Sequence, residues 1–157
     1  MNKLTFIKNI ILFLEGFCLY ITIECCFRGY SYFLSGIMGG LCVVILDKIN
    51  DRISWDIDLF WQALCGSCII TSMELIVGSI TKHTNLLPVM WDYSSLPFNY
   101  DGVICLPFSV AWLFLSIAAI FLADAINYYV FEDTGVPYYV LFGKIVIRFH
   151  KKKCDIR

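Results

Sequence analysis

Residues 103–126 read VICLPFSVAWLFLSIAAIFLADAI, and the only charged side chain in this run is Asp124, near its end. A helix needs about 20 mostly apolar residues to cross the hydrocarbon core of a bilayer, so the run is long enough to span it. Three more apolar runs are long enough to consider, at residues 9–27, 30–46 and 59–80. Because lipid offers the backbone no hydrogen-bond partner, we expect a bundle of about four transmembrane helices and not isolated strands.

Composition and charge point to the same class of protein. Of the 157 residues, 59% are hydrophobic and 16% are charged, and the mean hydropathy is +0.74, whereas a soluble domain is nearer half apolar and about a quarter charged. We therefore predict an all-α polytopic membrane protein with one helical domain over residues 1–141 and a basic cytoplasmic tail over residues 142–157. The formal net charge of −1 gives no indication of a nucleic-acid partner.

The distribution of Lys and Arg predicts the orientation of the chain in the membrane. Lys3 and Lys8 precede the first run, and Lys48 and Arg52 lie between the second and the third. Because cytoplasmic loops carry an excess of these residues, we expect both termini and the loop between the second and third runs in the cytoplasm, and residues 91–102 outside. The predicted tail adds further basic residues: Lys144, Arg148, Lys151, Lys152, Lys153 and Arg157.

The connection between the first two runs is very short, because it consists of little more than Arg28 and Gly29. We therefore expect the first two helices to pack as an antiparallel hairpin. Gly36 and Gly40 lie four residues apart, with Gly39 beside them. Such a face of small residues lets two helix backbones approach closely, within one chain or between subunits.

Neither the cysteines nor any catalytic motif indicates an enzyme or a bound cofactor. Eight cysteines would suggest disulfides in a small secreted protein, but seven of them lie in or beside apolar runs, where cysteine behaves as a small hydrophobe. Cys65 and Cys68 form a C-x-x-C inside the third run, and we expect them to pack rather than to bind a metal. The sequence has no Walker-type phosphate loop, G-x-S-x-G or dinucleotide fingerprint, so ATP hydrolysis would require another chain.

Two glutamates lie inside apolar runs, Glu24 in the first and Glu74 in the third. A carboxylate there costs at least about 2.5 kcal/mol, so such residues usually face a bundle interior or water and have a partner. One interpretation is that the two residues form a proton relay or a cation site. The alternative is structural, with Glu24 paired to Arg28 one helical turn later and Glu74 capped by the loop that follows. Asp124 is expected to be a solvated end of the fourth run.

Arg28 lies at the outer end of the first run. Its guanidinium group can hold a carboxylate or a phosphate through two parallel hydrogen bonds, which would make it a ligand-binding residue. Equally, it can anchor the helix at the membrane interface, or form an internal ion pair with Glu24 or Asp92.

Residues 91–102 (WDYSSLPFNYDG) form a polar, aromatic segment directly before the fourth run. Its proline stiffens the path and Gly102 permits a sharp entry to the helix, so we expect a structured loop that caps the bundle. Asp92 could act as a base, a ligand or a lid contact, or it could cap a short turn. The candidate substrate- or ion-binding residues are therefore Glu24, Arg28, Glu74, Trp91, Asp92, Tyr93 and Asn99, and no catalytic or metal-binding residue is predicted.

The same segment carries a family resemblance. From Trp91 to Ser109 the chain matches the pattern W-D-Y-S-x-x-P-F-N-x-x-G-x-I-C-L-P-x-S, and in this it resembles the small bacterial membrane proteins of the ABC-transporter type IV (CmpB-like) family. The resemblance extends to the acidic positions of Glu24 and Glu74 and to the Arg28–Gly29 pair. It implies a transport-related protein of the bacterial plasma membrane, with a separate ATPase subunit if the transporter description holds.

Three functions remain open from the sequence. The first is a permease-like protein with Glu24 and Glu74 as a proton or cation site, which implies a homo-oligomer because four short helices rarely enclose a pathway. The second is a membrane enzyme acting on a headgroup or a lipid-linked substrate, which requires Arg28, Glu74 and Asp92 to lie together near the headgroup plane. The third is a structural or interaction protein, whose carboxylates should be fully paired.

Overall fold

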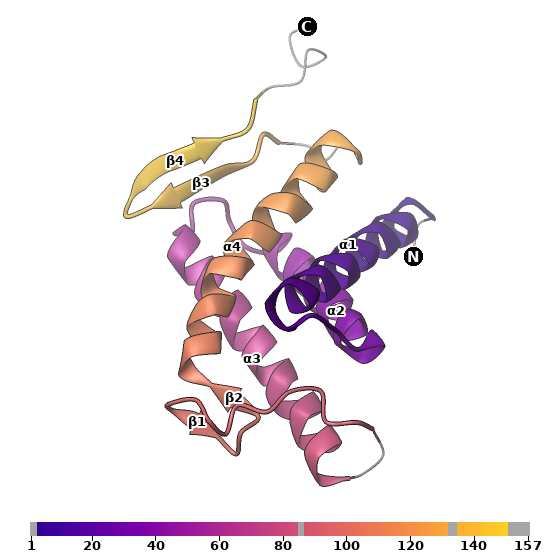
Figure 1. Ribbon diagram of the computed structural model, residues 1–157. Coiled ribbons are helices and arrows are strands. Elements are labelled where there is room, and N and C mark those ends of the chain that lie inside the picture. The colour runs from indigo at the N-terminus through magenta and orange to yellow at the C-terminus, as the bar shows by residue number, and fades with distance from the viewer. Residues whose placement is uncertain (1–2, 85–86, 132–134, 151–157) are drawn as a thin grey trace, which may run out of the picture.

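The structure is a computed structural model that describes residues 3–84, 87–131 and 135–150. It contains four helices, shown in Figure 1, and each is long and apolar enough to cross a membrane. They are α1 (Lys3–Arg28), α2 (Phe33–Asn50), α3 (Leu59–His83) and α4 (Leu106–Tyr129). The predicted all-α membrane fold is confirmed, and two small two-stranded sheets are added to it.

The helices extend beyond the apolar runs that predicted them. The first helix begins at Lys3 instead of residue 9, and the second continues to Asn50 instead of residue 46. Hydropathy marks the part of a helix that contacts lipid, whereas backbone hydrogen bonding continues through polar residues at the interface. The fourth helix begins later than expected, at Leu106, because the residues just before it are extended and Pro107 fits the first helical turn.

The first two helices pack as the expected antiparallel hairpin, and their contact is the most extensive between any two elements of the described chain. The chain reverses after Arg28 through Gly29, whose φ of +82° suits a residue without a side chain. Farther along the hairpin, a Cβ atom built on Gly39 would lie 2.5 Å from the Cβ of Tyr20 and 2.7 Å from the carbonyl oxygen of Gly16. The glycine face therefore serves close packing within one chain.

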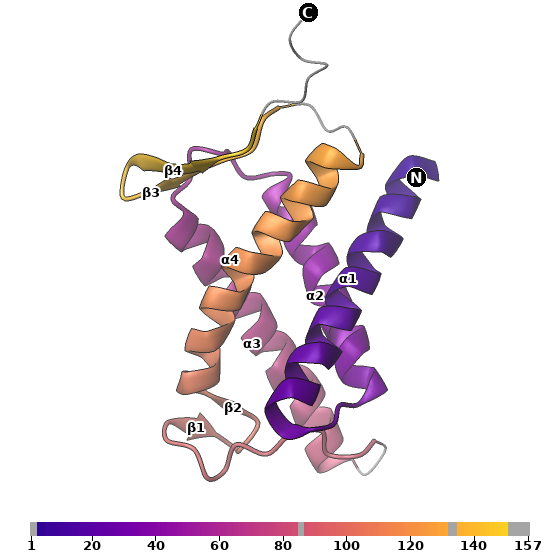
Figure 2. The same cartoon turned by 45° about the horizontal axis from the view of Figure 1, so that its top comes forward.

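The two small sheets lie at opposite ends of the helix bundle (Figure 2). Strands β1 (Asn99–Tyr100) and β2 (Ile104–Cys105) pair antiparallel at what we call the loop end. Strands β3 (Tyr138–Leu141) and β4 (Lys144–Arg148) pair antiparallel at the other end, which we call the hairpin end. The first turn of α1 lies at the hairpin end as well, so the described parts nearest both termini are on one side of the bundle.

The β3–β4 hairpin runs across residue 141, where the sequence predicted a boundary between the helical domain and a basic tail. Tyr139 is almost completely buried beside Leu59 and Ile120, which fixes β3 against the ends of α3 and α4. A turn at Phe142 and Gly143, both with positive φ, then brings β4 back along β3. The rest of the predicted tail, residues 151–157, lies outside the described residues.

Substituting alanine at Gly39 tests the close contact within the helix hairpin. We expect Gly39→Ala to lower the free energy of unfolding by about 1–3 kcal/mol, since the new methyl group meets backbone and Cβ atoms that cannot move away. Gly36→Ala is the matched control, because there the methyl group meets only the outer ring atoms of Phe17, which can rotate aside. Unfolding in mixed micelles measures both variants, and equal losses would contradict the prediction.

Candidate functional site

Glu74 is the most deeply buried carboxylate of the described chain, with 0% of its surface exposed. It projects from α3 toward α4 and the loop end. The hydroxyl group of Tyr93 donates a hydrogen bond to Oε1 (3.1 Å), and Nε1 of Trp112 donates one to Oε2 (2.8 Å). Both donors are neutral, and no described Lys, Arg or His forms an ion pair with this residue. The structure thus holds a carboxyl group in the bundle interior without a counter-ion.

The loop before α4 is folded so that Tyr93 points inward. Its backbone N–H donates to the carbonyl oxygen of Gly102 (2.7 Å), and the indole N–H of Trp91 donates to the carbonyl oxygen of Val103 (2.8 Å). The ring of Tyr93 stacks on Phe108 of α4, with 4.6 Å between the ring centroids. The predicted structured loop is therefore present, and its own hydrogen bonds place the tyrosine hydroxyl against Glu74.

Two polar residues of the loop stabilise its turns. Asp92 accepts a hydrogen bond from the backbone N–H of Ser94 (2.9 Å), which is the short turn considered from the sequence. Asn99 donates to the carbonyl oxygen of Leu96 (2.7 Å) and accepts from the backbone N–H of Gly102 (3.1 Å). Asn99 closes the loop on itself and does not line a cavity with the other candidates.

Glu24 and Arg28 form an ion pair one helical turn apart, with 2.6 Å between Oε1 and Nη2. Ser31 also donates to Glu24 (2.5 Å), and Nη1 of Arg28 donates to the carbonyl oxygen of Met90 (2.5 Å). This last bond connects the end of α1 to the segment that leads into the loop. The geometry agrees with the structural alternative for Glu24. The guanidinium group of Arg28 is bonded both to Glu24 and to the carbonyl oxygen of Met90.

A cavity of about 650 Å³ lies beneath the loop and brings most of the candidate residues together. Glu24, Arg28, Trp91, Asp92 and Tyr93 all line it. Glu74 does not, because the side chains of Tyr93 and Trp112 stand between its carboxyl group and the cavity.

Groups of different charge, from the loop and from the end of α1, line this cavity. Hydrogen bonds from the backbone and side chain of Ser94 lower the pKa of Asp92, so this carboxylate stays ionised at neutral pH and is a poor general base there. Burial, together with the neighbouring Glu74, raises the pKa of Tyr93, which keeps its hydroxyl group protonated and able to donate. The cavity is therefore lined by the ion pair of Arg28 with Glu24 and by the carboxylate of Asp92, whereas the hydroxyl group of Tyr93 donates to Glu74.

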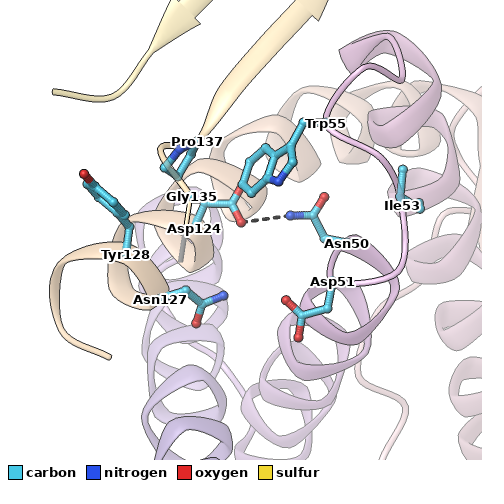
Figure 3. Close-up of a pocket in the computed structure, with 9 residues that line it drawn as sticks. All are labelled: Asn50, Asp51, Ile53, Trp55, Asp124, Asn127, Tyr128, Gly135 and Pro137. Atoms are coloured by element: carbon cyan, nitrogen blue, oxygen red, sulfur yellow. Dashed lines mark hydrogen bonds between the residues drawn. The ribbon is translucent and has the colours of Figure 1, made fainter. Parts of the chain in front are cut away.

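A second polar cluster lies at the hairpin end, and the sequence interpretation missed it. Asp124 is only 4% exposed, so the expectation of a solvated carboxylate at this position is wrong. It accepts hydrogen bonds from Nδ2 of Asn50 (2.8 Å) and from the hydroxyl group of Tyr139 (2.6 Å), as Figure 3 shows in part. Asp47 is also buried and accepts from Nδ2 of Asn127 (2.6 Å).

A sequence signal for this cluster did exist. Asp47-Lys-Ile-Asn50 directly follows the second run and Asp124-Ala-Ile-Asn127 overlaps the end of the fourth, so the same D-x-I-N pattern occurs twice. Residues three apart lie on one helix face, and each pattern therefore presents a carboxylate and an amide together. Cys65 and Cys68, by contrast, are exposed on α3 and belong to neither site.

Acidification tests how the loop is held to α3. Asp101 pairs with Lys82 and His83 at the end of that helix, and hydrogen bonds from Lys82 and then His83 lower its pKa. A carboxylate with a lowered folded-state pKa stabilises the fold above its unfolded pKa of about 4, and this contribution is lost as the pH falls further. The protection of the amides of residues 92–102, measured against the exchange rate of an unfolded chain at the same pH, should therefore fall below about pH 4. Asp101→Asn should show the lower protection even at neutral pH. Unchanged exchange in the variant would contradict this.

Removing one hydroxyl group tests the bond to Glu74. We expect Tyr93→Phe to lower the free energy of unfolding by about 1–3 kcal/mol, because a buried carboxylate oxygen loses its donor. Tyr100→Phe is the control, since Tyr100 belongs to the same loop and is 68% exposed. Unfolding of the two variants in mixed micelles should differ clearly, and similar values would mean that the Tyr93 hydroxyl contributes nothing.

Comparison with known protein families identifies the family of this chain. The family described as "Putative ABC-transporter type IV" matches residues 10–149, which is most of the chain. A search of curated proteins and a search of solved structures each found no match. The four apolar helices and the family together make this an integral membrane protein related to transport. The chain belongs to the ABC-transporter type IV (CmpB) family of membrane proteins.

Proposed function

We propose that the protein is a permease-like transport subunit in which Glu74 is the proton or cation site. The observation that supports this best is the burial of its carboxyl group with two neutral donors, Tyr93 and Trp112, and no described cation beside it. A structural carboxylate in a membrane is normally neutralised by a partner. A carboxyl group that exchanges a proton or a small cation has to be free of such a partner.

The cavity beneath the loop is the substrate entry in this proposal. Tyr93 separates it from Glu74, so an outward movement of the loop would remove one donor from the carboxyl group and open it to the cavity. Arg28 supports coupling between the two, because it bonds both Glu24 and the carbonyl oxygen of Met90, next to the loop. An anionic group entering the cavity would compete with Glu24 for this guanidinium.

Assembly and orientation belong to the same proposal. The cavity beneath the loop does not cross the four-helix bundle, which favours a homo-oligomer. The family and the absence of a Walker-type motif from the sequence favour a separate ATPase subunit. The start of α1, the end of α2 and strand β4 lie at the hairpin end (Figure 2), and they carry Lys8, Lys48, Lys144 and Arg148. This favours a cytoplasmic position for that end and for both termini. The loop end would then face the outside of a bacterial plasma membrane.

The two alternatives receive less support from the geometry. For a membrane enzyme, Arg28 and Asp92 do share the cavity, but Glu74 is screened from it by Tyr93 and Trp112. For a purely structural protein, the paired Glu24 fits well. Glu74 receives the loop contact that this alternative expected, from the hydroxyl group of Tyr93. It has no counter-ion among the described residues, which is what favours the proposal over a purely structural role.

Infrared spectroscopy of the protein in lipid tests the assignment. We expect a carboxyl band that changes reversibly with pH, or with Na⁺ or K⁺ at constant pH, and that is absent from Glu74→Gln. Glu24→Gln is the matched control, because Glu24 is ion-paired with Arg28 and its removal should leave the band in place. The pH series and the salt series together distinguish a proton from a metal cation. If the carboxyl band that responds to pH or cations is still present in Glu74→Gln, the proposal is wrong.

A further inference from the structure

The cavity beneath the loop adjoins a second, apolar hollow farther along the bundle. Both are lined by Tyr20 and Ile23 of α1 and by Trp112 and Leu115 of α4, so they meet between these two helices. The second hollow has a volume of about 130 Å³ and is lined almost entirely by apolar atoms. We call the cavity and the hollow together the α1–α4 seam. The seam leads from polar groups at the loop end into the apolar middle of the bundle.

The seam opens toward the apolar outer surface of the helices. Helices α1 and α4 make few contacts with each other, and side chains along the edges of the seam are partly exposed, with 38% of Ile23 and 42% of Leu122 accessible. At the loop end the two helices meet through the rings of Phe27 and Phe108, whose centroids are 6.0 Å apart. Because Phe27 is 80% exposed and can turn aside, a molecule dissolved in the membrane can reach the cavity from the side.

The apolar hollow has the length of one leaflet of a bilayer. It follows α4 from Trp112 to Leu122, and ten residues of helix rise by about 15 Å. The hydrocarbon core is about 30 Å thick, so the hollow spans about half of it. Tyr30 and Trp91, which line the cavity at the loop end, are residue types that favour the headgroup region. The seam therefore begins at headgroup depth and ends near the bilayer centre.

Two charged groups at the loop end of the seam have unused hydrogen-bonding capacity. A guanidinium group has five N–H donors, and Arg28 uses three of them, for Glu24 and for two backbone carbonyl groups. The other two have no partner among the described residues. Asp92 accepts from Ser94 and forms no ion pair within the described chain. The cavity thus presents free donors suited to a phosphate and a free carboxylate suited to an ammonium group.

We propose that the α1–α4 seam binds one phospholipid whose head carries both a phosphate and a primary ammonium group. The phosphate would accept from the two free N–H groups of Arg28, the ammonium group would donate to Asp92, and one acyl chain would lie in the apolar hollow. The cavity of about 650 Å³ is within the usual range of ligand pockets. A purely anionic head would meet the carboxylates of Glu24 and Asp92 without compensation. The inference rests on the proposed transport function in one respect, that this lipid is the transported substrate.

Photo-crosslinking of the full-length protein in nanodiscs tests the inference. The bilayer is phosphatidylcholine, whose ammonium group has no N–H to donate, with a small fraction of phosphatidylethanolamine that carries a diazirine in the middle of one acyl chain. We expect adducts on the residues of α1 and α4 that line the apolar hollow, located by mass spectrometry. Unlabelled phosphatidylethanolamine should displace the probe about fivefold better than phosphatidylglycerol, which has the phosphate without the ammonium group.

Two variants with matched controls locate the head and the chain. Asp92→Asn can keep the turn with Ser94, and it should remove the preference for phosphatidylethanolamine over phosphatidylglycerol. Asp56→Asn should keep this preference, because Asp56 is an exposed acid bonded to β3 at the hairpin end. Ala118→Phe places a ring in the apolar hollow and should abolish the adducts there. Val110→Phe should retain them, because Val110 is an exposed residue of the same helix outside the seam.

Glu74→Gln separates this inference from the transport proposal. Glu74 lines neither part of the seam, so the variant should give the wild-type adducts although it loses the infrared band. Failed lipid competition with an intact band would overturn the lipid and leave the proton or cation site standing. The expected adducts without a responsive band would support the lipid and contradict transport through Glu74. Adducts spread over the exposed positions of all four helices, equal displacement by the two lipids, or an adduct-free seam covered by a second copy of the chain would each overturn the inference.

Discussion

The burial of Glu74 is the constraint on which the loop end depends. A carboxyl group inside an apolar bundle requires hydrogen-bond donors, and the nearest helix supplies only one, the indole of Trp112. The second comes from Tyr93, which reaches inward only because the loop is braced by its own backbone and side-chain bonds. The conspicuous sequence of residues 91–102 is thus explained locally, as the support for one tyrosine hydroxyl group.

One face of α4 carries both polar sites. Trp112, Ser116, Ile120 and Asp124 follow each other at intervals of four residues, and all four are buried. Twelve residues of helix rise by about 18 Å, so the Glu74 site and the hairpin-end cluster lie far apart along the bundle. The apolar core between them includes Tyr20 stacked on Trp112 at 5.7 Å. The protein therefore has two separate polar sites on one helix rather than a continuous polar path.

The sequence alone predicted the helices, but it did not predict the polar contacts between them. Hydropathy predicted four spans because lipid imposes the same requirement on every residue of a run. It could not pair Asp47 with Asn127 or Asp124 with Asn50, since these partners are 80 and 74 residues apart. The repeated D-x-I-N pattern was visible, but a carboxylate near the end of an apolar run ordinarily reaches solvent. Here Tyr139 covers Asp124, because the β3–β4 hairpin folds back over the end of α4 where a tail was expected.

The packing of the bundle indicates where movement is easiest. The first two helices pack so closely that a Cβ atom built on Gly16, Gly39 or Gly40 would lie within 3 Å of the neighbouring helix. Helix α3 is joined to α4 by Ser67, which donates to the carbonyl oxygen of Ser109 (2.6 Å). Between these two pairs the contacts are fewer, and a mainly apolar hollow of about 130 Å³ remains. A movement of one pair against the other would leave Glu74 with both of its donors, because Trp112 and Tyr93 belong to α4 and to the loop before it. It would strain two connections, Arg28 to Met90 at the loop end and the Asp–Asn pairs at the hairpin end. Because the latter join α2 to α4 through two hydrogen bonds to buried carboxylates, they hold the two pairs together at the hairpin end.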